Sequence, residues 1–250
     1  MKNIAIKYVF AGLIIGLCPM IARSQTTLAN YNFTSASVAS TVSVGGVAAS
    51  TFTSPKSYFN FSSSNGTAYV FPTTVVNGSG GTSAYSTTVA DAIANNRYFQ
   101  FTITPDSGNQ VALSALSFNY GAITASGSFP QAGAPITVAF EVRSSVDNFT
   151  TSIGSVSASF NQSENNVTGL YTINLTSISG YSLLTTATTF RIYAYFSSGT
   201  PGYSDSSRLD NVSLTGTVSA IPEPSAYAAG MGVIALCGAV AFSRRRRGTA

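Results

Sequence analysis

The sequence predicts an all-β domain, a two-sheet antiparallel β-sandwich of the jelly-roll kind, with a helix before it and a helix after it. Apolar and polar residues alternate over short runs, which is typical of half-buried strands. Gly-, Asn- and Ser-rich stretches separate these runs. Because half-buried strands need a second layer over their apolar face, a sandwich is the simplest fold that satisfies the pattern.

The first strand is expected at residues 28–33 and the second at 38–44, followed by short strands at 58–61 and 68–71 and a helical turn at 90–95. In the run that follows, Phe99, Phe101 and Ile103 alternate with polar neighbours. A turn follows at 105–108. Further strands are expected at 97–104, 111–120, 136–143, 152–160, 170–175, 190–196 and 208–218. The total of about ten to twelve fits a jelly roll. A β-helix is the alternative, but no fixed repeat supports one.

The C-terminus contains a proline-flanked boundary, an apolar run and a basic cluster, in that order. Residues 220–225 form a linker with Pro222, Glu223 and Pro224, which resist helix formation. Residues 226–243 carry no charge, and a helix of that length rises about 27 Å, close to a bilayer core of about 30 Å. The tail 244–250 opens with four arginines, which the positive-inside rule places in the cytoplasm. They are Arg244, Arg245, Arg246 and Arg247.

This order of Pro222-Glu223-Pro224, apolar span and terminal arginines resembles the PEP-CTERM sorting signal of Gram-negative bacteria. The resemblance covers residues 221–247. It implies recognition by an exosortase, a membrane-embedded processing enzyme, and removal of the tail. Glu223 would then be a recognition residue of a substrate. The alternative is an ordinary C-terminal anchor with a proline hinge.

The N-terminus predicts a signal peptide over residues 1–24. Lys2 and Lys7 precede an apolar segment, and small residues lie at the −3 and −1 positions of a cleavage site after Ser24. Cleavage there leaves Gln25 as the new N-terminus. The general secretion machinery is therefore an expected partner. We expect a single-pass inner-membrane intermediate with a cytoplasmic C-terminus, and a final location at the cell surface or outside the cell.

The composition of the exported domain, residues 25–219, excludes several classes of function. Both cysteines, Cys18 and Cys237, lie in the targeting segments, and the chain has no histidine. A Ser-His-Asp or Cys-His centre is thus impossible within this chain. Most basic residues also lie in the targeting segments, so the domain has no cationic cluster for a nucleic-acid partner. No cofactor is expected.

Several short motifs between residues 97 and 218 resemble those of secreted bacterial sandwich domains that precede sorting tails, a group similar in layout to carbohydrate-binding jelly rolls. They include Val142-Arg143-Ser144-Ser145 and Leu209-Asp210-Asn211-Val212. The tail and these motifs together favour a noncatalytic structural or adhesive component of an extracellular polysaccharide or biofilm matrix. The alternative is a carbohydrate-binding module, and a glycan-active enzyme is the weaker alternative.

Asp210 is the one candidate metal ligand. It lies at the expected start of the last strand, where it would bind a structural Ca²⁺ if Asn30, Asn32 or Asp205 lay nearby, because calcium takes six to eight oxygen ligands. The simpler interpretation is a turn-capping aspartate or an ion-pair partner of Arg208 or Arg191.

Two polar or aromatic groups are predicted on outward-facing strand positions. Glu141 and Arg143 alternate with apolar neighbours and would form a cluster with Arg191, more simply a cross-strand ion pair than a glycosidase dyad. Tyr193 and Tyr195 alternate with Ile192 and Phe196, so they are candidates for a sugar-stacking pair. Packing inside the sandwich is the simpler interpretation of the tyrosines.

Overall fold

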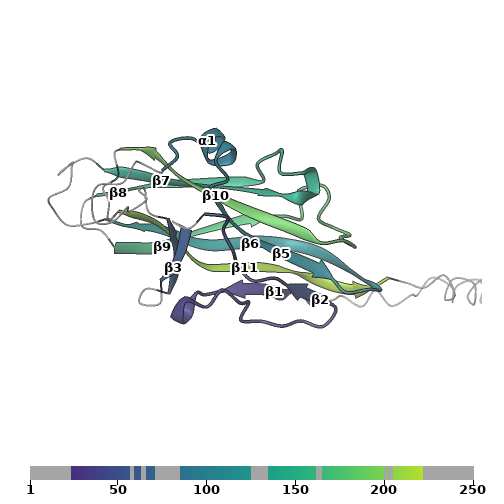
Figure 1. Cartoon of the computed structure of the whole chain (residues 1–250). Coiled ribbons are helices and arrows are strands. Elements are labelled where there is room, and N and C mark those ends of the chain that lie inside the picture. Colours follow the sequence, from purple (N-terminus) through teal and green to yellow (C-terminus); the bar gives the residue numbers. More distant parts are fainter. Residues whose placement is uncertain are drawn as a thin grey trace, which may run out of the picture.

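The computed structural model describes residues 24–56, 59–62, 66–70, 85–124, 135–161, 165–199, 201 and 205–221. These residues form eleven strands and one short α-helix (Figure 1). The strands are β1 (Thr26–Tyr31), β2 (Val47–Ala49), β3 (Phe59–Ser62), β4 (Thr67–Val70), β5 (Tyr98–Pro105), β6 (Asn109–Ile123), β7 (Ile136–Ser144), β8 (Gly154–Phe160), β9 (Asn165–Asn174), β10 (Thr188–Ser198) and β11 (Ser206–Ala220), and the helix is α1 (Val89–Ala94).

All strand pairs are antiparallel, and they form two sheets. Sheet A has the order β3-β4-β11-β6-β9, and β1 also pairs with β11; sheet B has the order β2-β5-β10-β7-β8. From β4 onward the chain changes sheet at every connection except β7 to β8. The last strand, β11, therefore lies between β4 and β6, which is the strand order of a jelly roll. The predicted two-sheet antiparallel sandwich is confirmed.

Alternating apolar residues bring the two sheets together, as their spacing predicts. Phe99, Phe101 and Ile103 of β5 are almost completely buried, and so are Phe118 of β6 and Phe140 of β7. The phenylalanine rings pack against aromatic rings of both sheets, for example Phe118 of β6 against Phe140 of β7 with ring centroids 6.2 Å apart. Burial of such side chains is worth about 1.5–3 kcal/mol each, so this core is the main source of stability.

The prediction of a strand at 38–44 is wrong. This segment follows the outer edge of β1 as a loop, and only Val44 makes a single bridge, to Val47. The Ser40 hydroxyl donates to Val42 O and accepts from Val42 N and Asn30 N, so it satisfies groups that a strand ladder would otherwise pair. The second strand instead begins at Val47, after a turn with Gly46 at φ +86°.

The helical turn predicted at 90–95 is confirmed as α1. Thr88 caps it, with its hydroxyl accepting a hydrogen bond from Asp91 N at 3.2 Å. Figure 1 shows α1 lying over the layer that contains β7 and β10. Its residue Ala92 packs against Tyr98 and Tyr193, on the face of sheet B that points away from the sandwich interior.

Within the described ranges, no helix has the length and apolar character needed to cross a bilayer. The predicted signal segment up to residue 23 and the predicted transmembrane segment at 226–243 lie outside the described residues. The sandwich itself closes before the tail, since β11 ends at Ala220 and Ile221 N donates to Gly108 O at 2.8 Å.

Candidate functional sites

The two predicted processing sites flank the sandwich. Ser24 and Gln25 are exposed and lie directly before β1, and the Gln25 amide donates to Thr215 Oγ1 at 2.7 Å. The predicted cleavage site therefore precedes the first strand and interrupts no described element. Pro222, Glu223 and Pro224, like the arginines at 244–247, lie outside the described residues.

Glu141 and Arg143 lie on the outer face of sheet B and form an ion pair. Arg143 Nε donates to Glu141 Oε1 at 2.7 Å, and Glu141 is only 8% exposed. The Arg143 guanidinium also donates to the carbonyl oxygens of Phe149 and Thr150, at 3.1 and 2.7 Å. The pair lies within β7 and not across two strands as predicted. Through Arg143 it holds the loop after β7 against the sheet.

Arg191 joins this cluster by stacking between two rings. Its guanidinium carbon lies 4.4 Å from the centroid of Tyr98 and 3.8 Å from that of Phe149. In register it faces Arg143 on β7 and Gln100 on β5, and it is not ion-paired to Glu141 within the described residues. The rings, the ion pair and the loop cover most of this region, so the cluster is not an open site.

Tyr193 and Tyr195 point to the outer face of sheet B, as predicted, but they do not form an exposed platform. Tyr193 is 2% exposed because α1 covers it, and its ring lies 5.3 Å from that of Tyr98. Tyr195 is half-buried, and burial together with the Glu141 carboxylate raises its pKa. Every tyrosine and phenylalanine whose burial is described is buried or half-buried.

Asp210 lies inside β11 rather than at its start. The strand bulges between Asp210 and Ser213, and Asn211 takes a left-handed conformation with φ 49°. The Asp210 carboxylate accepts hydrogen bonds from Asn211 N at 2.6 Å and from the Asn211 amide at 3.1 Å. Burial raises the pKa of Asp210, and the hydrogen bond from Asn211 N partly opposes this shift.

Two of the other proposed calcium ligands, Asn30 and Asn32, make contacts close to β1. The Asn30 amide donates to Thr41 Oγ1 at 3.1 Å, and Asn32 Oδ1 accepts from Thr34 N at 3.2 Å. Among the described residues, no three acidic, histidine or cysteine side chains lie close enough to hold a metal ion. A calcium site at Asp210 stays a prediction.

Arg208 is a buried cation that sequence reasoning did not single out as a site. It is 6% exposed, and it donates to Ser206 Oγ at 2.8 Å and to Thr67 Oγ1 at 3.0 Å. Its guanidinium lies 4.4 Å above the Tyr69 ring, and burial lowers its pKa to about 10. The pairing of β11 with β4 brings Arg208 next to Thr67 and Tyr69, which are far from it in the sequence. No local sequence pattern could therefore have revealed these contacts.

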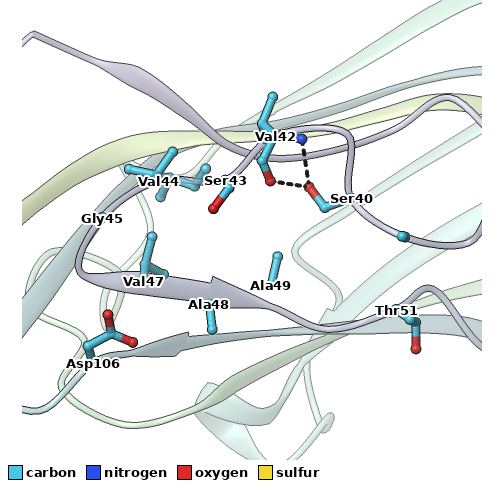
Figure 2. Close-up of a pocket in the computed structure, with 12 residues that line it drawn as sticks. Ser40, Val42, Ser43, Val44, Gly45, Val47, Ala48, Ala49, Thr51 and Asp106 are labelled. Carbon is cyan, nitrogen blue, oxygen red and sulfur yellow. Dashed lines mark hydrogen bonds between the residues drawn. The ribbon is translucent and has the colours of Figure 1, made fainter.

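A groove of about 510 Å³ lies between the 38–44 loop and β2. Figure 2 shows Val42 and Val44 on one side, Val47 and Ala49 on the other, and Asp106 at one end. Its remaining lining residues are Leu28 and six small or hydroxyl-bearing residues, Ala39, Ser40, Ser43, Gly45, Ala48 and Thr51. Among the described residues that line it, Asp106 is the only one with an ionisable side chain.

Two further carboxylates, those of Asp91 and Asp147, have structural partners. Asp91 pairs with Arg97 at 3.3 Å. Asp147 accepts a hydrogen bond from Thr151 N at 2.8 Å; burial raises its pKa, but hydrogen bonds from Thr151 and Thr150 outweigh that effect and hold it below its usual value. Both contacts are local: they join α1 to Arg97 and stabilise the turn at 147–151.

Comparison with known proteins identifies no family for this chain. Neither a protein-family model nor a curated protein matches the chain. One similar solved structure comes from work on the promiscuous specificity of carbohydrate-binding modules of the β-sandwich superfamily. The alignment has 13% identity and a TM-score of 0.28, and it covers 74% of this chain but 61% of that one. At that TM-score, the likeness carries no argument about ligand or activity.

Proposed function

We propose that this chain is an exported, noncatalytic β-sandwich protein that a PEP-CTERM-type tail delivers to the cell surface. Its role there is structural or adhesive, within an extracellular polysaccharide or biofilm matrix. The observation that carries the proposal is the order of Pro222-Glu223-Pro224, an uncharged run and four arginines. An exosortase-type enzyme and the general secretion machinery are the expected partners.

The boundary of the sandwich supports a separation between the folded domain and a removable tail. The last strand ends at Ala220 and the last backbone bond of the fold is made by Ile221, one residue before Pro222. A processing enzyme could therefore remove the tail without taking a residue of the described core. The position of Ser24 and Gln25 just before β1 supports removal of the leader in the same way.

The ionisable groups of the sandwich support a noncatalytic role. Glu141, the acid that was considered as one half of a glycosidase dyad, is paired with Arg143 and is only 8% exposed. Carbohydrate binding is the alternative function. The groove beside β2 is the surface to test for it, because the candidate tyrosines Tyr193 and Tyr195 are buried or half-buried.

Deletion of residues 222–247 tests the sorting function. The truncated chain keeps the whole described sandwich, so we expect it to fold and be exported but to be lost from the surface fraction. A matched control replaces Glu223 with Gln and keeps the apolar run and the arginines, which separates motif recognition from membrane insertion. Unchanged surface delivery of the truncated chain would contradict the proposal.

A further inference from the structure

The outer edge of β8 is an unpaired strand edge. β8 is the last strand of sheet B and pairs with β7 alone, over seven consecutive residues from Gly154 to Phe160. Apart from the Ser152 hydroxyl, which donates to Gly154 O at 3.4 Å, no hydrogen bond joins the β8 backbone to a described residue outside β7. Alternate residues of an edge strand direct N–H and C=O groups outward, and these form a template for another strand.

On the opposite side of the sandwich, the outer edge of β1 is covered by a loop, whereas the edge of β8 has no such cover among the described residues. There the 38–44 loop covers β1, with Thr41 N donating to Asn30 O at 2.7 Å and Asn30 N to Ser40 Oγ at 3.2 Å. Proteins also protect edges with charged side chains, prolines or bulges. β8 has the sequence Gly-Ser-Val-Ser-Ala-Ser-Phe, without charge or proline, and its pairing with β7 has no register shift.

The side chains of β8 are compatible with a copy of themselves. Ser155, Ser157 and Ser159 are exposed on the outer face, whereas Val156 and Ala158 are half-buried and pack against the core. A two-fold axis perpendicular to the sheet and passing beside Ser157 would set serines opposite serines and Val156 opposite Ala158. No like charges would meet, and the exposed remainder of Val156 and Ala158 would be covered.

We propose that β8 pairs antiparallel with β8 of a second copy of this chain, so that the two B sheets become one continuous sheet. The partner is a second copy because one neutral, small-residue strand is complementary to itself in this register. β9 lies against β8 across the sandwich, since a Cβ added at Gly154 would come within 2.7 Å of Tyr171 Oη. Both sheets thus end at this side, and the second copy would continue sheet B.

This inference deepens the proposed matrix role, in which chains assemble with one another, but it does not depend on the sorting tail. Association is measured on purified protein, whereas sorting is measured in the host. Failure of either experiment therefore leaves the other standing.

The test introduces charge at the two-fold position. The full chain in detergent is studied by sedimentation equilibrium as wild type, as Ser157→Lys, as Ser157→Asp, and as an equimolar mixture of the two variants. Like charges opposite each other repel, so each variant alone should dimerise at least about fivefold more weakly than wild type. The mixture should regain dimers, because unlike charges then face each other.

The control is Thr104→Lys, which places the same charge on an exposed position of β5, an inner strand of sheet B. It should leave the dimer unchanged. A second variant, Ser157→Cys, should form an interchain disulfide under mild oxidation that wild type, whose cysteines are Cys18 and Cys237, does not form. The Cα atoms of paired antiparallel residues lie about 4.5–5.5 Å apart, which a disulfide can span. A wild type that stays monomeric, or Ser157 variants that associate as wild type does, would overturn the proposal.

Discussion

Phe52 joins the two sheets of the sandwich although it belongs to no strand. It lies after β2, it is fully buried, and its ring centroid is 5.1–6.3 Å from five other rings. They belong to Tyr31, Phe33, Phe61, Phe99 and Phe101, so residues of both sheets contact it. Phe52→Ala should remove these contacts and leave a cavity that rigid neighbouring rings cannot fill.

The expected loss in the free energy of unfolding is about 3–5 kcal/mol, the usual cost of a buried Phe→Ala substitution. That is a large part of a typical total of about 5–15 kcal/mol. Urea unfolding of the exported protein, followed by far-UV circular dichroism, measures it. The control is Phe149→Ala, which removes a half-buried ring stacked on Arg191 and should cost about 1 kcal/mol or less. Equal losses for the two variants would refute the assignment of Phe52 as the centre of the core.

Three further predictions concern ionisable groups. Burial raises the pKa of Tyr31 above its ordinary value near 10, so above about pH 10 the folded state holds more protons than the unfolded state. The free energy of unfolding should therefore fall as the pH rises above about 10, and Tyr31→Phe should reduce this fall in urea titrations at several pH values. Glu141→Gln should lower the free energy of unfolding by about 1–3 kcal/mol, because Arg143 loses its charged acceptor, and an unchanged urea midpoint would argue against the ion pair as a structural contact. EDTA should leave the thermal midpoint unchanged, because Asn211 already occupies the Asp210 carboxylate; a drop that Ca²⁺ reverses would instead establish a calcium site.

The period-two pattern predicted much of the fold. The runs around Phe99, Phe118 and Phe140 form strands with those side chains inside, because burial of alternate aromatic residues determines both the strand and its orientation. The pattern was misleading at 38–44. Valines at 38, 42 and 44 also alternate, but the Ser40 hydroxyl competes for the backbone groups of Val42 and Asn30, and the segment covers β1 as a loop.

The candidate sites were less predictable, because their environment comes from residues distant in the sequence. The alternation at Tyr193 and Tyr195 correctly gave the outer face of β10, yet it contained no information that α1 would cover it. Arg208 lies on Tyr69 only through strand pairing across more than a hundred residues. Sequence periodicity fixes which face a side chain occupies, whereas burial on that face depends on loops and helices packed from elsewhere.

The intact mass of the protein recovered from the outer surface of its host shows whether the sandwich is exported and then released from its tail. We expect a species that begins at Gln25 and ends between Pro222 and Ser225. A species that retains Arg244 to Arg247 would contradict it. In that case the tail is a permanent anchor, and the sandwich acts at the inner membrane.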